Sequence, residues 1–440
     1  MRPSYRLSAV LSLLGYTLGA TRIAHAQANQ FTNIADNISM PRASSGLTFG
    51  GFNNAGTVVF SAGYATATPF VYASGIYSGN GGAITTIAGG NDAAGAGYQA
   101  PIITNSGAVG YLNNVVGTQI NAYIEYNGTT QLVASYTTQG APSNSHYLFP
   151  GVTDGNNSIS VSPNIGTNTG TTIYTAQNGN LTSTTLPISY QPPAAINGQT
   201  SAFLTTGQTV FSQTLWLGNG AAPVAVFNPT GTGAYFLQSI HLNSSNNVVF
   251  LDRQTGVYAG NSNGVSAVVT TAGQFNQFTS ADNNDAGTIA FAALLDNGSA
   301  GIFLDRDGSF ITLANTADGY FGSFNSDIAL NNQGTVAFQA TTTTGASGIY
   351  AALTGTTTPV KVLASGDSLF GSTVQSVSYQ ALNDNNQIAF SYSLANGQYG
   401  IAVANLSSGL TAAAPEPGSI ALALVAGLPA LGIARRRKRR

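Results

Sequence analysis

The sequence contains no cysteine, which excludes disulfide bonds and thiolate metal sites. Charge is also scarce: Asp, Glu, Lys and Arg make up 6% of the 440 residues, against about 25% in an average soluble domain. Only three histidines occur, with no HExxH or HxxxH spacing, so a transition-metal site is not expected. We interpret His146 and His241 as surface or packing residues.

Basic residues are nearly missing from the body of the chain. Residues 27–414 hold four Lys and Arg against fourteen Asp and Glu. Proteins that bind nucleic acid gather Lys and Arg on one face to meet the phosphates. Four scattered cations cannot form such a face, so we expect no nucleic-acid partner.

Signatures of catalysis are missing as well: there is no G-x-S-x-G elbow, no P-loop and no dinucleotide-binding glycine motif. Glycoside hydrolysis requires two carboxylates, and the candidate pairs are Asp305 with Asp307 and Asp282 with Asp285. Both pairs lie beside Gly or Asn, as turn-forming aspartates do. We therefore expect no enzymatic activity, and the alternative is a polysaccharide hydrolase or lyase that uses Asp305 and Asp307.

The best candidate for a cation site is the segment DNNDAG, residues 282–287. It supplies Asp282, Asn284 and Asp285, but it lacks the oxygen ligand at the fifth position of a calcium loop. A turn without metal is favoured, with calcium as the alternative. No other cofactor is expected.

The chain is rich in apolar and aromatic residues, which recur at regular intervals. Hydrophobic residues make up 43% of it, with 20 Tyr and 21 Phe. Three stretches are almost identical: NNAGTVVF (53–60), NNDAGTIAF (283–291) and LNNQGTVAF (330–338). Five further copies bring the total to eight, which end 39 to 52 residues apart at Phe60, Tyr111, Val161, Phe211, Phe250, Phe291, Phe338 and Phe390.

One position of this repeat is restricted in every copy. Four residues before the final residue stands only Gly or Asn, the two residues that best tolerate positive φ. We therefore predict a tight turn that feeds a strand in each copy. The turn residues are Gly56, Gly107, Asn157, Gly207, Asn246, Gly287, Gly334 and Asn386.

Three more strands are predicted in each unit. A second strand resembles Gly75-Ile76-Tyr77, a third resembles residues 83–90, and a fourth resembles residues 320–331. Trp216 replaces the Ile or Val of the second strand, which indicates a packing role. Four strands in a unit of this length are typical of a propeller blade.

The predicted fold is all-β, an eight-bladed β-propeller over residues 27–411. Seven blades are the alternative, if the weak copy at 154–161 is an insertion. The last unit lacks its third strand, and the spare strand at residues 30–37 is predicted to complete it. Such closure would remove the open sheet edges.

The N-terminus has the pattern of a secretory signal peptide over residues 1–26. Arg2 and Arg6 precede an apolar stretch, and Ala24-His25-Ala26 forms a small-residue cleavage site before Gln27. We therefore expect the protein to be exported.

The C-terminus, residues 412–440, is predicted to insert in the inner membrane. Residues 418–434 carry no charge, and 17 residues are the lower limit for a spanning helix. The cluster that follows holds six of the 13 Lys and Arg of the chain and would stay on the cytoplasmic side. The body of the protein would then lie outside.

This tail resembles the PEP-CTERM sorting signal of Gram-negative bacteria that produce exopolysaccharide. The resemblance rests on Pro415-Glu416-Pro417, the apolar span and the terminal cluster that begins with Arg435, Arg436 and Arg437. It implies an exosortase-like protease as partner, cleavage near the Pro-Glu-Pro, a transient membrane span, and a final place at the cell surface or in the extracellular matrix.

The repeats also resemble those of choice-of-anchor proteins with tandem NxxGxxAF motifs. The copies at Asn284 and Asn331 match that motif in full. The resemblance implies a fold and a sorting class without a chemistry. Together these observations predict an exported protein whose propeller binds exopolysaccharide or another matrix component.

Overall fold

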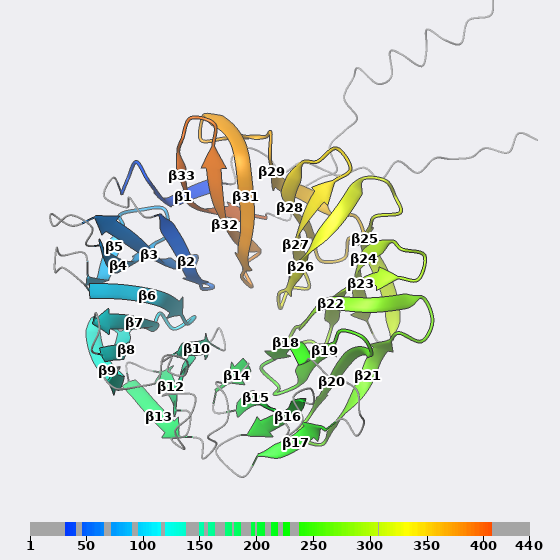
Figure 1. Cartoon of the computed structure of the whole chain (residues 1–440), viewed down its shortest axis with the longest axis horizontal. Helices are drawn as coiled ribbons and strands as arrows, with labels where there is room; N and C mark the ends of the chain where they lie inside the picture. Colours follow the sequence, from blue (N-terminus) through cyan, green and yellow to red (C-terminus); the bar gives the residue numbers. More distant parts are fainter. Residues whose placement is uncertain are drawn as a thin grey trace, which may run out of the picture.

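The computed structural model describes residues 31–406, apart from 41–45, 66–71, 90–95, 116–118, 138–148, 154–156, 163–171, 178–179, 186–194, 199, 207–212, 219–222, 229–236 and 307. In these residues the chain forms 33 strands and no helix. The strands build eight antiparallel sheets arranged in a ring (Figure 1). The predicted eight-bladed β-propeller is confirmed.

Seven blades are each made of four consecutive strands, with the first nearest the centre and the fourth outside (Figure 1). Blade 1 contains β2 (Leu47–Phe52), β3 (Val58–Ala65), β4 (Tyr72–Gly79) and β5 (Thr85–Gly89). Blade 2 contains β6 (Ala96–Ile103), β7 (Val109–Val115), β8 (Gln119–Tyr126) and β9 (Thr129–Thr137). Blade 3 contains β10 (Phe149–Thr153), β11 (Ser158–Ser162), β12 (Thr172–Gln177) and β13 (Asn180–Thr185).

The next four blades follow the same order. Blade 4 contains β14 (Ala195–Asn197), β15 (Thr200–Thr206), β16 (Gln213–Gly218) and β17 (Val224–Phe227). Blade 5 contains β18 (Leu237–Leu242), β19 (Val248–Asp252), β20 (Gly256–Asn261) and β21 (Gly264–Thr270). Blade 6 contains β22 (Phe275–Asn283), β23 (Ile289–Leu295), β24 (Ala300–Arg306) and β25 (Ser309–Asn315). Blade 7 contains β26 (Phe321–Leu330), β27 (Val336–Thr342), β28 (Ser347–Ala352) and β29 (Val360–Ala364).

Blade 8 is shared between the two ends of the chain. Its sheet runs in the order β1 (Phe31–Asp36), β33 (Tyr399–Asn405), β32 (Gln387–Leu394), β31 (Ser372–Leu382) and β30 (Ser368–Leu369). The predicted closure by the N-terminal strand is therefore confirmed. Strand β1 pairs antiparallel with β33, and Phe31 packs edge-on against Phe390 at 5.9 Å.

The repeat turn joins the first and second strands of a blade. In blade 6 the N–H of Asn284 donates to the Thr288 carbonyl (3.1 Å), and the N–H of Gly287 donates to the Asn284 carbonyl (3.0 Å). Gly287 has φ of 79°, while Asn246 and Asn386 have φ of 61° and 55° at the equivalent position. The restriction to Gly or Asn thus follows from the left-handed backbone that this turn requires.

Two of the weaker repeat copies, at 154–161 and 204–211, differ in whether the predicted turn is found in the structure. Strands β10 and β11 pair across residues 154–157, so the copy at 154–161 is a genuine blade turn and the seven-blade alternative is wrong. The copy predicted at 204–211 is misplaced. The first hairpin of blade 4 pairs Asn197 with Thr200, and Gly207, outside the described residues, falls between β15 and β16 instead. Blade 4 has a shorter turn, so its pattern lies several residues earlier than the spacing suggested.

An aromatic pair stacks across the second and third strands of most blades. Phe338 lies opposite Tyr350 with ring centroids 5.9 Å apart and an interplanar angle of 19°. Equivalent stacked pairs are Phe60–Tyr77, Tyr111–Tyr123, Phe203–Trp216, Phe250–Tyr258 and Phe291–Phe303. Trp216 therefore packs as predicted, but it occupies the Tyr position of its strand and not the Ile position.

Buried residues of adjacent blades share clusters that seal the seams between sheets. One cluster joins Ile302 and Leu304 of blade 6 to Phe338 and Tyr350 of blade 7. Phe338 and Tyr350 are both 0% exposed. Since full burial of a large apolar side chain contributes about 1.5–3 kcal/mol, these seams hold neighbouring blades in a fixed register.

The first strand of every blade except blade 4 carries a β-bulge. In β18 the bulge falls between Gln238 and His241, and in β22 it falls between Phe278 and Ser280. The other bulges are in β2, β6, β10, β26 and β31. A bulge turns the side chains that follow it, so these strands re-aim their last residues toward the central channel.

Candidate functional site

The repeat turns meet around the central axis, and in five of them a buried asparagine side chain joins two blades. In Asn331 the Nδ2 group donates to the Asn383 carbonyl of the next blade (2.9 Å), while Oδ1 accepts the N–H of Thr335 (2.9 Å). Equivalent donations cross to the next blade at 3.0–3.2 Å from Asn243, Asn284, Asn383 and Asn53. We call Asn53, Asn243, Asn284, Asn331 and Asn383 the clamp asparagines, all 4–5% exposed.

The residue that follows each clamp asparagine makes a second ring of bonds. The N–H of Asp285 donates to Oδ1 of Asn332 (2.9 Å), and the N–H of Asn332 donates to Oδ1 of Asp384 (2.9 Å). The same step links Ser244 to Asp285, Asp384 to Asn54 and Asn54 to Asn105. Two concentric rings therefore fix the turns of blades 5, 6, 7, 8, 1 and 2.

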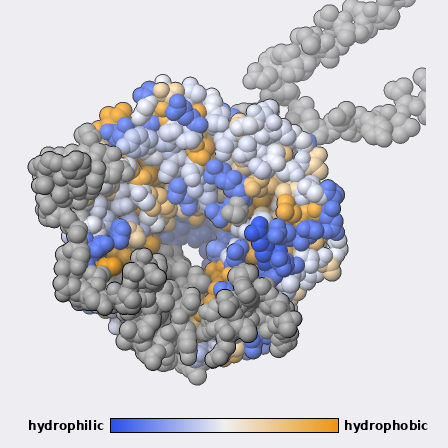
Figure 2. Space-filling model, in the orientation of Figure 1, coloured by the Kyte–Doolittle hydropathy of each residue, from blue (hydrophilic) through white to orange (hydrophobic). Residues whose placement is uncertain are grey.

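The second ring surrounds a cavity of about 200 Å³ on the channel axis. We call this cavity the mouth. Its rim consists of Asn54, Asn105, Asn197, Ser244, Asp285, Asn332 and Asp384, and its floor includes Phe52, Leu242, Leu330 and Leu382. Figure 2 shows the hollowed centre of the molecule with hydrophilic residues beside it. Amide and carboxylate groups from six blades thus converge on one place.

The wall just beneath the mouth holds a carboxylate that is largely shielded from solvent, Asp282, whose side chain is 14% exposed. Oδ2 of Asp282 accepts the N–H of Leu330 (2.8 Å), and Oδ1 accepts the N–H of Asn283 (2.8 Å) and lies 3.4 Å from Nδ1 of His241. Burial raises the pKa of Asp282 above its ordinary value, although His241 and the two N–H groups oppose that shift. Burial, reinforced by the charges of Asp282 and Asp327, also raises the pKa of Tyr379, whose phenol stays neutral.

The proximity of His241 and Asp282 was not predicted from the sequence. His241 was interpreted as a surface or packing residue, and its side chain is 47% exposed beside the carboxylate. Both residues stand two positions before a clamp asparagine, in neighbouring blades. A comparison of equivalent repeat positions would have revealed the pair.

The calcium candidates point in different directions. Oδ2 of Asp282 reaches Leu330, Oδ1 of Asn284 accepts the N–H of Thr288, and Oδ1 of Asp285 accepts the N–H of Ser244. Each residue thus uses an oxygen within the turn or the blade contacts. No group of three His, Asp or Glu side chains able to hold a metal occurs in the part of the chain that the structure describes.

Of the aspartates proposed for the hydrolase alternative, Asp305 and Asp307, the structure describes Asp305. Oδ1 of Asp305 accepts the N–H of Gly308 (3.0 Å) and stabilises the hairpin between β24 and β25. Asp307 lies outside the described residues. Asp305 therefore has the turn-forming role that its Gly neighbour suggested.

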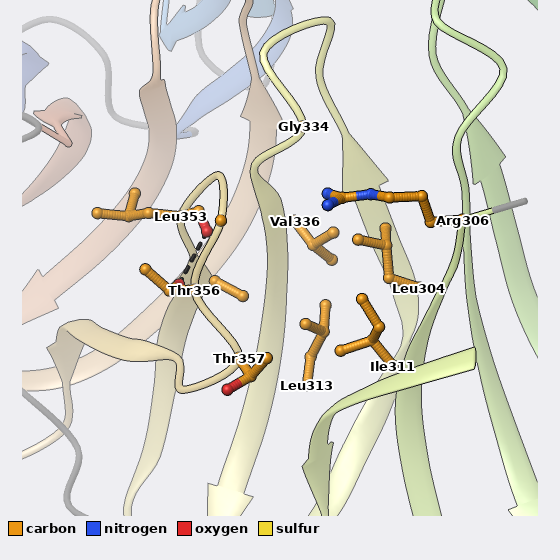
Figure 3. Close-up of a pocket in the computed structure, with 11 residues that line it drawn as sticks. Leu304, Arg306, Ile311, Leu313, Gly334, Val336, Leu353, Thr356 and Thr357 are labelled. Carbon is orange, nitrogen blue, oxygen red and sulfur yellow. Dashed lines mark hydrogen bonds between the residues drawn. The ribbon is translucent and has the colours of Figure 1, made fainter. Parts of the chain in front are cut away.

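A small apolar cavity lies in the seam between blades 6 and 7. Figure 3 shows Leu304, Ile311, Leu313 and Val336 facing one another there, with Arg306 extended above them. Its volume is about 50 Å³, room for only a few water molecules. This cavity is a packing gap between sheets.

The remaining predicted residues divide into two groups. Gly56, Gly107, Gly287 and Gly334 all have positive φ in their turns, as predicted. The signal-cleavage residues Ala24 and Ala26, the sorting residues 415–417 and the cluster 435–440 lie outside the described residues. Within the described ranges, no helix has the length and apolar character needed to cross a membrane.

Comparison with known proteins identifies the architecture only. No protein-family model matches the sequence, and no curated protein is similar to it. Among solved structures, it resembles a prolyl endopeptidase at 11% identity and a TM-score of 0.45, covering 71% of this chain and 50% of that one. It also resembles a puromycin-hydrolysing peptidase of Mycobacterium tuberculosis at 12% identity and a TM-score of 0.43, covering 84% and 61%. The WD40 domain of SCAP from fission yeast is similar at 9% identity and a TM-score of 0.45, covering 88% and 98%.

The chain therefore spans only 50% of the prolyl endopeptidase and 61% of the puromycin-hydrolysing peptidase. The expectation that this chain has no enzymatic activity is contradicted, because hydrolases stand among the proteins of similar structure, and we withdraw it. At these identities and TM-scores the likeness extends to the fold alone, so it assigns no peptidase activity. What the comparisons and the structure share is a β-propeller.

Proposed function

We propose that the propeller is the binding domain of an exported surface or matrix protein and that its mouth binds an uncharged polysaccharide. The observation that supports this most directly is the rim of the mouth, where Asn, Asp and Ser residues from seven blades surround a cavity of about 200 Å³. Amides donate to and accept from sugar hydroxyls, and carboxylates accept from them. The two hydrogen-bond rings hold these groups in place before any ligand arrives, which lowers the entropy lost on binding.

Charge indicates which class of polysaccharide fits. Among the residues that the structure describes, the lining of the mouth includes Asp285 and Asp384 and no basic residue. An acidic polysaccharide would be repelled there, because like charges at close range destabilise a complex. A neutral chain would meet only hydrogen-bonding groups and the apolar floor.

The test uses a residue that contributes only its backbone to the rings. Ser244 donates its N–H to Asp285, accepts from Asn197 through its carbonyl, and has an exposed side chain. A Ser244→Trp substitution should block the mouth without removing a ring bond and abolish saturable binding of a neutral polysaccharide. Ser245→Trp, one residue further on, is the matched control. Equal binding by both variants would refute a site at the mouth.

The binding assay also measures released reducing sugar. Binding without release supports a binding domain. Release of oligosaccharide would replace the proposal with a polysaccharide hydrolase or lyase.

We further propose export through residues 1–26 and sorting through residues 412–440, on the strength of the two terminal patterns. N-terminal sequencing of the secreted protein should begin at Gln27. Replacement of Pro415, Glu416 and Pro417 by Ala should leave the uncut protein in the inner membrane. Normal release of that variant would contradict the sorting role.

A further inference from the structure

Blade 7 contains a second cavity, on the face of the ring opposite the mouth. It has a volume of about 190 Å³ and is lined by the loop before β26, the β27–β28 turn and the segment after β29. The β26–β27 turn contributes Asn332 to the mouth, and the seven residues of β27 separate the two ends. A strand of that length spans about 20 Å. We call this cavity the blade-7 pocket.

One residue that lines this pocket has a buried hydroxyl without a hydrogen-bond partner. Tyr350 lines it, is 0% exposed, and its phenol oxygen makes no hydrogen bond. The hydroxyl of Tyr320 is the nearest phenol, and its proximity adds to the rise in the pKa of Tyr350, but it does not meet the geometry of a hydrogen bond to the Tyr350 oxygen. Burial raises the pKa of Tyr350, so its O–H remains a neutral donor. Buried polar groups in native proteins nearly always find a partner, and an unmet donor in a cavity points to a ligand oxygen.

The other walls of the pocket supply a charge pair. Nζ of Lys361 lies 2.6 Å from Oδ1 of Asp367, and their side chains are 14% and 29% exposed. Oδ2 of Asp367 accepts the N–H of Ala364 (2.8 Å), which fixes the carboxylate. Lys361 keeps two further N–H donors. The pair is electrically neutral as a unit, so the pocket has no net charge to attract an ion.

The pocket is also held open by its own hydrogen bonds. Oγ1 of Thr343 donates to the Gly319 carbonyl (2.9 Å), and the N–H of Thr343 donates to the Tyr320 carbonyl (3.0 Å). These bonds join the β27–β28 turn to the loop before β26. Tyr320 is half-buried and lines the same cavity, which gives the pocket an aromatic wall.

We propose that the blade-7 pocket binds one neutral sugar ring, with Tyr350, Lys361 and Asp367 as its hydrogen-bonding groups. A sugar presents adjacent hydroxyls that both donate and accept, which matches a Lys–Asp pair side by side, and a third oxygen would accept from Tyr350. The C–H face of the ring would pack on Tyr320. The cavity is smaller than the usual range of about 300–1,000 Å³ for drug-sized ligands, which favours a single ring over a longer chain. This site is independent of the mouth, since the two lie on opposite faces.

The test measures binding of methyl glucoside, methyl galactoside and methyl mannoside to the intact protein by saturation-transfer NMR and calorimetry, with glucuronate as the anionic comparison. Tyr350→Phe removes one oxygen and leaves the stacked ring in place. It should weaken binding of the preferred neutral sugar at least tenfold while thermal stability is kept or raised. Lys361→Met should weaken binding similarly. Tyr258→Phe, at the equivalent position of blade 5, is the matched control and should bind normally.

Each outcome decides the proposal. Loss of binding in Tyr350→Phe and Lys361→Met, with normal binding in Tyr258→Phe and Ser244→Trp, supports it. Binding that Tyr350→Phe leaves unchanged, binding of glucuronate in preference to the neutral sugars, or no binding of any of the three glycosides would each overturn it. Loss of sugar binding in Ser244→Trp alone would place the site at the mouth and also overturn the pocket.

Discussion

At the scale of single residues, the repeat motif is explained by two demands on one turn. Its first position must be a side chain that both donates and accepts, because Asn331 bonds to Asn383 on the next blade and to Thr335 in its own turn. Its fourth position must adopt positive φ, as Gly287 and Asn386 do. Asparagine and glycine therefore recur for different physical reasons.

The clamp asparagines should be important for stability. Substitution of Asn331 by Ala removes one inter-blade donor and leaves buried backbone groups unpaired, so we expect a loss of about 1–3 kcal/mol in the free energy of unfolding. Denaturant unfolding monitored by circular dichroism would measure it. Asn297→Ala is the control, because the exposed Asn297 side chain bonds locally to Ser299. It should cost less than about 0.5 kcal/mol, and an equal loss would argue against the clamp.

At the turn glycine Gly287, the cost of backbone strain can be measured without a cost from steric contact. A Cβ added at Gly287 would meet no atom within 4 Å, so backbone strain is the only cost of a side chain there. We expect Gly287→Ala to lose about 1–2 kcal/mol. Gly287→Asn should lose less, because asparagine already occupies this position at Asn246 and Asn386. Thermal unfolding of the two variants would test the order, and a reversed order would contradict it.

Asp282 should make stability depend on pH. Its pKa is raised in the folded protein from an ordinary value of 3.8, chiefly by burial, so the folded state binds the proton more tightly than the unfolded state does. The stability this contributes is complete below 3.8 and is lost as pH rises through the raised pKa. Relative to Asp282→Asn, the wild type should therefore lose unfolding free energy over that interval. A difference between the two proteins that is constant with pH would contradict the assignment.

At the scale of elements, the closing strand β1 supplies the outer strand of blade 8. It covers β33 and buries Ile34 (4% exposed) and Ala35 (0%). An uncovered β33 would present unpaired N–H and C=O groups to other molecules. The N-terminal strand thus has a role in solubility as well as in closure.

Deletion of residues 27–37 should open blade 8. We expect a loss of about 3–5 kcal/mol, because Phe31, Ile34 and Ala35 lose their contacts, together with self-association through β33. Calorimetry and light scattering would measure the two effects. A synthetic peptide of residues 30–38 should restore both properties, and failure of the deletion to lower stability would show that β1 is dispensable.

At the scale of the whole molecule, the ring is not uniform. The clamp bonds run from Asn243 through blades 6, 7, 8 and 1 to Thr104. In blade 4 the strand pairing places Asn197 at the position equivalent to Asn331. Asn197 is only half-buried, and the bond by which it donates to the Ser244 carbonyl of blade 5 (2.9 Å) is exposed to solvent. A solvent-exposed bond contributes less than a buried one.

Local opening should therefore begin at blade 4. We expect the amides of Asn331, Gly334, Asn383 and Asn386 to be among the slowest to exchange with deuterium, and those around Asn197 and Thr200 to exchange at a lower opening free energy. Hydrogen exchange read by mass spectrometry would compare the two regions. Equal protection in both would mean that the clamp bonds do not control cooperativity.

Most of the turns and strands, and the closure of the ring by residues 30–37, could be predicted from the amino-acid sequence alone. Positive φ at Gly or Asn and the alternation of side chains along a strand are local properties. They can therefore be predicted wherever the repeat is well preserved. The predicted turn at Gly207 is wrong because the first turn of blade 4 is shorter than in the other blades. The aromatic pair of this blade is Phe203 with Trp216. The sequence could not reveal that departure, since strand pairing alone defines the register.

The groups of polar side chains that lie close together could be identified only from the three-dimensional fold. Asp285, Asn332 and Asp384 follow one another at intervals of 47 and 52 residues, and ring closure alone brings them to one mouth. The same is true of His241 with Asp282. In the blade-7 pocket, Tyr350, Lys361 and Asp367 are close in sequence, but burial of the phenol without a partner depends on how blades 6 and 7 pack. Local sequence sets the conformation of each blade, whereas the composition of the sites depends on how the blades pack around the ring.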